Sequence, residues 1–181
     1  MEINELVSLI ADLLKEFDLT RPVHKHFKPG IGPFGEPQLI KELSKLLKSK
    51  GHLAYTKRIP DLSIDNEWAL EFKIVRPFGD NGKEAENWSI NLLHPYAGNT
   101  SAIGDAIKLI KEVCMKKKAV FAIGYEHETA KISLNPLLDS FELIAKYMRL
   151  PLGPRIEEQR NNLVHPEHQV IRCVAWEILN N

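Results

Sequence analysis

The stretch PDLSIDNEWALEFK, residues 60–73, decides how this chain folds. Apolar and polar residues alternate in residues 61–64 and again in residues 68–73. Successive side chains of a β-strand point to opposite faces of the sheet, so this period of two predicts two strands. The polar residues 65–67 between them predict the turn of a β-hairpin. Asn66 is the turn residue that we expect to adopt a left-handed backbone conformation.

The apolar residues of the two strands indicate the register of this hairpin. A turn through residues 65–67 pairs Ile64 with Trp68 and Leu62 with Leu70. These four side chains then lie together on one face of the hairpin. A slip of one residue would move each strand's apolar set to the opposite face, so the pattern favours this register.

Charged residues gather on the second face of the hairpin. In the predicted register Asp61 lies opposite Glu71, and cross-strand partners have Cβ atoms about 5 Å apart. Lys73 follows Glu71 by two residues and therefore projects from the same face. An acid and a base in an otherwise apolar strand are costly to bury unless they are paired or used.

The two carboxylates predict a metal site. Negative charges at this separation repel each other unless a positive charge lies between them. Magnesium is a hard cation that prefers oxygen ligands, and manganese is expected to substitute for it. Lys73 would orient a water molecule or help to deprotonate it. The constellation therefore predicts metal-assisted hydrolysis of a phosphodiester bond.

At these residues the chain resembles the PD-(D/E)xK nuclease superfamily. Pro60-Asp61 corresponds to the first half of the superfamily motif, and Glu71-Phe72-Lys73 corresponds to the second half. The resemblance covers roughly residues 35–125 and implies a restriction endonuclease-like core. It implies that Asp61, Glu71 and the Phe72 carbonyl bind the metal. It also implies that Lys73 positions the attacking water.

Many members of this superfamily carry a further glutamate on the helix before the hairpin, and two residues compete for this role. Glu36 opens the predicted helix after a glycine-rich loop, whereas Glu42 lies further along it. Leu39, Ile40 and Leu43 follow Glu36 at helical spacing. That phase resembles the archaeal junction-resolving and restriction-like members, so we favour Glu36 as the fourth catalytic residue.

The remaining segments predict the layers of the fold. Apolar residues recur at helical spacing in residues 3–17, 36–50, 101–114 and 135–149. Strands are predicted for residues 53–56, 60–64, 68–75, 119–125 and 169–179. Residues 20–37, 76–100 and 151–166 are predicted as loops. This order predicts an α/β (α+β) fold, a restriction endonuclease-like three-layer sandwich with a mixed central β-sheet flanked by helices.

We expect a single nuclease-like domain over residues 1–181, in which residues 1–19 form an additional N-terminal helix. A chain of this length buries a large core without disulfides. The strongly apolar stripe of the additional helix has two possible roles. It covers the sheet, or it forms the interface of a homodimer, which cleavage of both DNA strands would require.

The composition excludes several classes of protein. Hydrophobic residues make up 44% and charged residues 27%, which excludes disordered chains, fibres and low-complexity tails. No apolar run approaches the ~18 residues of a membrane span, so no membrane partner is expected. Cys114 and Cys173 each lie in an apolar run and indicate buried free thiols of a reducing compartment. The expected location is cytoplasmic.

The equal numbers of basic and acidic residues limit where a nucleic acid could bind. Because 24 basic residues face 24 acidic ones, a DNA-binding surface has to come from local grouping of side chains. The candidates lie in the loop after the catalytic strand or on the next helix, and they offer charge or amide groups. They are Arg76, Lys83, Asn87, His94 and Lys108. Trp88 and Tyr96 of the same loop offer rings for base stacking.

The sequence therefore predicts a magnesium-dependent endonuclease that acts on DNA, either restriction-like or of a defence or repair type. Two alternatives remain open. The chain is a nucleic-acid-binding module of the same fold without catalytic activity, or it is an RNA nuclease. The balanced charge mildly favours a partner that supplies specificity, since proteins that bind duplexes alone usually present a basic stripe.

Overall fold

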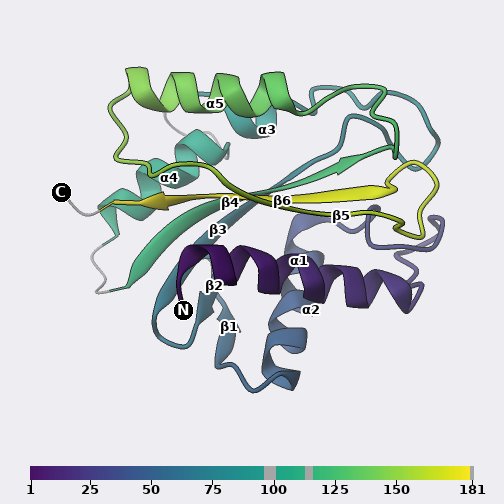
Figure 1. Ribbon diagram of the computed structural model, residues 1–181, viewed down its shortest axis with the longest axis horizontal. Helices are drawn as coiled ribbons and strands as arrows, with labels where there is room; N and C mark the ends of the chain where they lie inside the picture. The colour runs from purple at the N-terminus through teal and green to yellow at the C-terminus, as the bar shows by residue number, and fades with distance from the viewer. Residues whose placement is uncertain (96–100, 113–115, 180–181) are drawn as a thin grey trace.

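The computed structural model describes residues 1–95, 101–112 and 116–179 of the chain. A six-stranded sheet forms the middle layer, and helices cover both of its faces (Figure 1). The helices are α1 (Ile3–Leu19), α2 (Glu36–Ser49), α3 (Ile90–Leu93), α4 (Ala102–Lys111) and α5 (Asn135–Tyr147). The strands are β1 (Ala54–Thr56), β2 (Leu62–Ile64), β3 (Trp68–Val75), β4 (Lys117–Glu126), β5 (Ile156–Arg160) and β6 (Val170–Ile178).

The sheet is mixed, with the strand order β1-β2-β3-β4-β6-β5. β3 and β4 are parallel, and the chain between them crosses over through α4. All the other neighbouring strands pair antiparallel. The predicted three-layer α/β sandwich with a mixed sheet is therefore confirmed. The two central parallel strands are buried along almost their whole length, as parallel strands covered by helices usually are.

Two apolar clusters hold the layers together, one on each face of the sheet. The first contains the apolar faces of α1 and α2, and the second contains those of α4 and α5 (Figure 1). Along β3, Leu70, Phe72 and Ile74 belong to the first cluster, whereas Val75 belongs to the second. Because side chains alternate along a strand, Glu71 and Lys73 project toward the side of α4. The two charged residues are thus placed inside the second layer.

The β2–β3 hairpin has the predicted register. Leu62 pairs with Leu70 and Ile64 pairs with Trp68. The turn closes with a hydrogen bond of 2.9 Å from the Glu67 N–H to the Ile64 carbonyl. Asp65 and Asn66 both adopt a positive φ, so the left-handed conformation that was expected for Asn66 extends to its neighbour. Asp and Asn are among the residues that tolerate this conformation.

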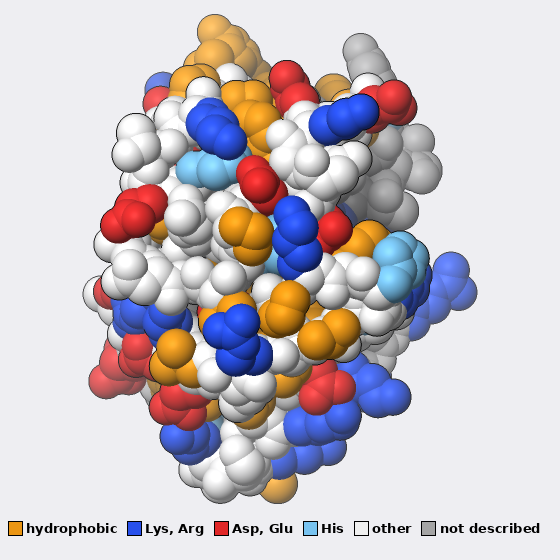
Figure 2. Space-filling model, turned by 90° about the vertical axis from the view of Figure 1, so that its right-hand side faces the viewer, with side chains coloured by type: hydrophobic (Ala, Val, Ile, Leu, Met, Phe, Trp, Pro, Cys, Tyr) orange, Lys and Arg blue, Asp and Glu red, His pale blue; other side chains and the backbone are white. Residues whose placement is uncertain are grey.

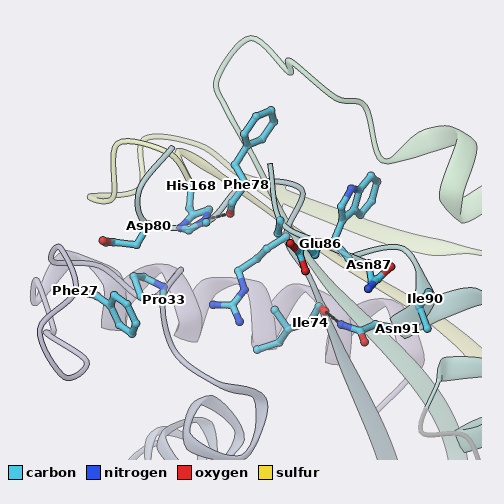
Figure 3. Close-up of a pocket in the computed structure, with 14 residues that line it drawn as sticks. Phe27, Pro33, Ile74, Phe78, Asp80, Glu86, Asn87, Ile90, Asn91 and His168 are labelled. Atoms are coloured by element: carbon cyan, nitrogen blue, oxygen red, sulfur yellow. Dashed lines mark hydrogen bonds between the residues drawn. The ribbon is translucent and has the colours of Figure 1, made fainter. Parts of the chain in front are cut away.

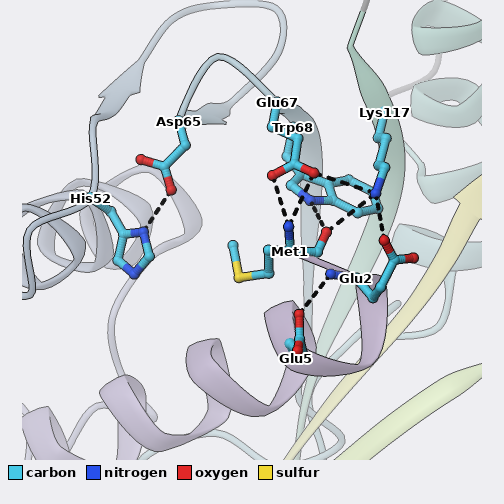
Figure 4. A network of polar contacts seen from close by, with 8 residues as sticks. All are labelled: Met1, Glu2, Glu5, His52, Asp65, Glu67, Trp68 and Lys117. Carbon is cyan, nitrogen blue, oxygen red and sulfur yellow. Dashed lines mark hydrogen bonds and ion pairs between the residues drawn. The ribbon is translucent and has the colours of Figure 1, made fainter.

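α1 lies against the sheet rather than facing away from it. Its apolar residues belong to the first core cluster, and it packs on β5 and β6. The start of the helix is tied to the hairpin and to β4 (Figure 4). The amino group of Met1 lies 3.1 Å from a Glu67 carboxylate oxygen, and Lys117 pairs with both Glu67 and Glu2. Of the two roles predicted for the apolar stripe, the structure shows that it covers the sheet.

The predicted loops contain two elements that the sequence pattern missed. β5 lies within residues 151–166, which were wrongly predicted as a loop. Its sequence IEEQR has no apolar alternation, because β5 is an edge strand held by backbone pairing to β6 and by ion pairs. Arg160 pairs with Asp12 of α1, and Glu157 pairs with Arg172 of β6. The short helix α3 lies within residues 76–100, which were likewise predicted as a loop.

The boundaries of the remaining elements agree with the predicted ranges to within a few residues. Cys173 is a buried free thiol, as predicted, whereas Cys114 and Tyr96 lie outside the described residues. Among the helices that the structure describes, none has the length and apolar composition needed to span a membrane.

Candidate active site

The buried ammonium group of Lys73 is surrounded by oxygen atoms. Its Nζ lies 3.2 Å from Glu36 Oε1 and 2.7 Å from Asp105 Oδ2. It also donates a hydrogen bond of 2.9 Å to the carbonyl of Phe72. The contacts to Glu36 and Phe72 are hydrogen bonds, whereas the contact to Asp105 is an ion pair. Lys73 therefore joins the first turn of α2, strand β3 and helix α4.

Asp61 and Glu71 form the second half of the site. Asp61 directly precedes β2, and its Oδ2 accepts a hydrogen bond of 2.9 Å from the backbone N–H of Phe72. The carboxyl groups of Asp61 and Glu71 lie close enough for the charge of Asp61 to raise the pKa of Glu71. Glu71 is only 3% exposed, and its Oε1 has no hydrogen-bond partner among the described residues. The two acids thus face each other, as the hairpin register predicted.

The proximity of these acids changes their proton affinity. Burial, together with the negative charges of Asp61 and Asp105, raises the pKa of Glu71 to about 8. Burial also raises the pKa of Asp61 and of Glu36 above the ordinary values, although Lys73 opposes both shifts. Carboxyl groups that resist ionisation in this way are common where a site is built to receive a positive charge.

Burial and neighbouring charges have opposite effects on the pKa of Lys73. Burial by itself lowers the pKa of a lysine, because it disfavours the ammonium form. The neighbouring charges of Glu36 and Asp105 outweigh this effect, so the pKa of Lys73 is raised. In this arrangement Lys73 is a donor of hydrogen bonds.

Asp105 is the member of the site that the sequence analysis missed. It lies in the first turn of α4 and is 1% exposed. Besides Lys73 it binds Lys108, whose Nζ lies 2.6 Å from Asp105 Oδ1. Acidic residues are common in the first turn of a helix, because the positive end of the helix dipole stabilises them. The position of Asp105 in the sequence therefore gave no indication of a role in the site. The crossover from β3 to β4 brings it to Lys73.

The structure also separates the two competing glutamates of α2. Glu36 contacts Lys73, whereas Glu42 pairs with Lys45 on the exposed side of the helix. Glu36 opens the helix at the end of the sheet where the polar side chains gather. The glutamate that the superfamily resemblance favoured is therefore the one that contacts Lys73.

The oxygen atoms of the site include donors that would suit a magnesium ion. Among residues 1–95, 101–112 and 116–179, no three His, Cys, Asp or Glu side chains converge closely enough to hold a metal by themselves. Asp61 and Glu71 nevertheless offer the hard oxygen donors that magnesium prefers, and Glu71 Oε1 is buried without a partner. The donor set of these two acids therefore fits a cation completed by water or substrate oxygens. The carbonyl of Phe72, the third predicted ligand, accepts a hydrogen bond from Lys73.

A small cleft leads to the acids from outside. Its volume is about 200 Å³, and Glu36 and Asp61 line it together with Lys41 and Lys57. Both lysines are exposed, and neither forms an ion pair with a described residue. Basic side chains at the mouth of an acidic site attract a phosphate group that the acids alone would repel.

The predicted DNA-binding residues take up different positions. Arg76 and Asn87 line a larger pocket beyond the end of β3. Lys83 is exposed, whereas Lys108 pairs with Asp105 and so belongs to the Lys73 cluster. The carbonyl of His94 accepts a hydrogen bond from the Ser101 hydroxyl at the start of α4.

Figure 2 shows the end of the molecule on the right-hand side of Figure 1. Basic, acidic and hydrophobic side chains are interspersed over most of this face, and Lys and Arg side chains gather toward its lower right. This mixture agrees with the equal numbers of basic and acidic residues in the chain.

Residues from four separate parts of the chain thus meet around Lys73. They come from the first turn of α2, the segment before β2, strand β3 and the first turn of α4. The chain matches no protein-family model, no curated protein and no solved structure.

Proposed function

We propose that this protein is a metal-dependent nuclease that hydrolyses phosphodiester bonds in DNA. One observation carries the proposal. A lysine that is held in place by two acids lies beside a second pair of acids, one of which has a buried oxygen without a partner. A cluster of this kind costs stability, so its presence favours a chemical use.

In the proposed mechanism Asp61 and Glu71 would hold the divalent cation, magnesium or manganese. The cation supplies positive charge that polarises the phosphate and makes a bound water more acidic. Asp61 is oriented by the backbone N–H of Phe72, and Glu71 is fixed within β3. The chain thus presents both carboxylates from rigid elements, as a precise site requires.

Lys73 would position the attacking water. Lys73 makes two hydrogen bonds and an ion pair with Asp105, so an incoming water or phosphate oxygen would compete with these oxygen atoms. The bond to Glu36 is the longest of the three, and Glu36 is the more exposed of the two acids that hold Lys73. When the substrate enters, Lys73 would bind the water in place of Glu36, and the freed carboxylate would accept a hydrogen bond from that water.

Asp105 and the cleft lysines would act without touching the reacting atoms. Asp105 forms an ion pair with Lys73 and would hold the ammonium group of Lys73 in position. Lys41 and Lys57 would attract the backbone phosphates of the substrate as it enters the cleft. Cleavage of both strands needs two sites, so a homodimer on DNA belongs to this proposal. The expected cytoplasmic location remains a prediction.

The experiment that tests this function compares several nucleic acids under one set of conditions. Supercoiled, linear and single-stranded DNA and RNA are each incubated with the protein, with and without magnesium. We expect cleavage of DNA in magnesium and none after chelation. Lys73→Ala should abolish cleavage while DNA affinity stays the same, because Lys73 acts on the water. Lys45→Ala, which removes an exposed lysine of α2, is the matched control.

Each alternative function gives a different result in this assay. Cleavage of RNA and not of DNA would make the protein an RNA nuclease. DNA binding with no cleavage of any substrate, in magnesium or manganese, would identify a binding module. Cleavage by Lys73→Ala at the rate of the unmodified protein would overturn the assigned role of the lysine.

A further inference from the structure

A second cavity lies beyond the end of β3, outside the cluster around Lys73. Its volume is about 510 Å³, which is within the range of pockets that hold small molecules. Figure 3 shows it between Phe27 and Pro33 on one side and Asn87 and Asn91 on the other. Ile74, which directly follows Lys73 in β3, also lines it. The side chain of Ile74 projects from the opposite face of β3 to that of Lys73, so the link to the candidate active site runs through Pro33, three residues before Glu36.

Aromatic rings form much of the wall of this pocket. Phe27 comes from the loop between α1 and α2, whereas Phe78 and Trp88 come from the segment after β3. Trp88 packs against the second core cluster, Phe27 lies against His24 and His26, and Phe78 meets His127 edge to face. All three side chains are nevertheless partly exposed, so each ring keeps some surface for a ligand. Flat aromatic faces of this kind stack on nucleic acid bases with little regard to base identity.

The polar side chains of the pocket keep part of their hydrogen-bonding capacity for a ligand. Arg76 donates a hydrogen bond of 2.6 Å to the Gly32 carbonyl, and among the described residues no carboxylate pairs with its charge. Asn91 donates to the Ile74 carbonyl, and its own side-chain oxygen accepts no hydrogen bond from a described residue. The side chain of Asn87 is exposed and makes no hydrogen bond with a described residue. Amide and guanidinium groups are the side chains that most often recognise base edges.

Two acids line the pocket, and because Asp80 is already paired with His165, Glu86 is the one that distinguishes between the possible ligands. Glu86 lines the pocket, is exposed and forms no ion pair with a described residue. Its carboxylate would repel a phosphate group placed in the pocket. It would accept a hydrogen bond from the amino group of adenine or cytosine. The two acids outnumber the one cation of the lining, Arg76, so the pocket is suited to a base rather than to a phosphate.

We infer that this pocket receives an unpaired base of the DNA strand that is cut, next to the phosphate held at the candidate active site. This inference rests on the proposed nuclease function and adds a substrate class to it. The strand would pass from the acids along the end of β3, and the neighbouring base would turn into the pocket. A base leaves the stack most easily where it is unpaired or mismatched, so the preferred substrate is DNA with such a defect.

The test measures binding, so that it does not depend on catalysis. Three DNA duplexes are compared in the presence of a chelator: one with a single bulged adenine, one with an abasic residue at the same bulge, and one fully paired. Stacking of one base on aromatic side chains corresponds to about five- to 150-fold in affinity. We expect the adenine bulge to bind at least fivefold more tightly than the abasic bulge.

Two variants connect this difference to the pocket. Phe27→Ala removes one aromatic wall from an exposed loop, and it should reduce the adenine preference by at least threefold. Tyr147→Ala removes a highly exposed ring from α5 and is the matched control. Trp88 provides an independent signal, since Trp68 and Trp176 are buried in the core. Binding of the adenine bulge should quench tryptophan emission, and Trp88→Phe should lack this quenching.

The possible outcomes separate this inference from the proposed function. Equal affinity for the adenine and abasic bulges, in a protein that still cleaves DNA, would overturn the base pocket and leave the nuclease function standing. Loss of both binding and cleavage for every DNA would overturn both. Free adenosine monophosphate tests the source of the base. If it quenches Trp88 as strongly as the bulged duplex does at equal concentration, the pocket takes a free nucleotide and the assignment to a DNA base fails.

Discussion

Asp105 Oδ2 lies 2.7 Å from Lys73 Nζ, and both side chains are buried. The two residues belong to different elements, because Lys73 is in β3 and Asp105 is in the first turn of α4. Their contact sets the direction of the ammonium group. The same contact makes α4 part of the candidate active site.

Asp105→Asn should slow cleavage without weakening DNA binding. The amide removes the charge that holds Lys73, and a small displacement of a reacting group lowers rates by about 10- to 100-fold. Stability should change little, because the loss of the ion pair is offset by weaker repulsion among the acids. Single-turnover cleavage and equilibrium binding measure the two effects. Asp139→Asn, an exposed aspartate of α5 that pairs with Arg155, is the control.

The two glutamates of α2 provide a matched pair of variants. Glu36→Gln should lower the cleavage rate by about 100-fold, because the amide is a weaker acceptor for a proton from water. Glu42→Gln should leave the rate unchanged, since this residue pairs with Lys45 on the other side of the helix. Initial rates in magnesium decide between them. Equal rates for the two variants would remove Glu36 from the mechanism.

The stability of the protein without magnesium should depend on pH through Glu71. Its folded pKa of about 8 lies above the ordinary value of 4.5. The folded state therefore binds more protons between these values, and the free energy of unfolding falls as the pH rises through this window. The slope is at most about 1.4 kcal/mol per pH unit and disappears above pH 8. Asp61, Lys73 and Asp105 are the charged groups that face Glu71 and act on its pKa.

Glu71→Gln should flatten that pH dependence. At pH 8 in a chelator we expect the variant to be about 0.5–2 kcal/mol more stable than the unmodified protein, because the repulsion with Asp61 is gone. Magnesium should stabilise the unmodified protein at this pH, and it should have little effect on the variant. Urea denaturation from pH 5 to pH 8 tests these expectations. A variant with the original pH slope would show that the slope has another source.

Lys57→Ala should weaken DNA binding and leave the fold intact. Lys57 is exposed at the mouth of the cleft that contains Glu36 and Asp61. Loss of one phosphate contact reduces the slope of log K against log salt by about one. Titrations at several salt concentrations measure this slope. Lys48→Ala, at the exposed end of α2 and outside the cleft, should leave the slope unchanged.

Gly32→Ala should destabilise the wall of the larger pocket. A Cβ atom at this position would lie 2.2 Å from Nδ1 of the buried His168, whose ring is held by a hydrogen bond to the Phe78 carbonyl. Overpacking of this kind costs about 1–3 kcal/mol. At Gly153 the nearest atom to an added Cβ is 3.5 Å away, so Gly153→Ala is the control. A stability equal to that of the control would show that the ring of His168 can move aside.

The hairpin and its charged face were predictable from residues 60–73 alone. Alternation along a strand shows which apolar side chains share a face, so Leu62, Leu70 and their partners determine the register. Once the register is set, Asp61 and Glu71 have to face each other. Glu36 was favoured over Glu42 because the helical phase that follows it resembles members of the superfamily, and Glu36 is the one that contacts Lys73.

Asp105 and β5 depended on the tertiary structure. Asp105 is an unremarkable acid at a helix start until the parallel pairing of β3 and β4 carries α4 over Lys73. β5 has no apolar alternation, because its stability comes from backbone pairing with β6 and from ion pairs such as Arg160–Asp12. The periodicity of apolar residues within one segment indicates which face of that segment packs in the core. An ion pair between distant segments produces no such periodicity, because each charged residue by itself resembles a surface residue.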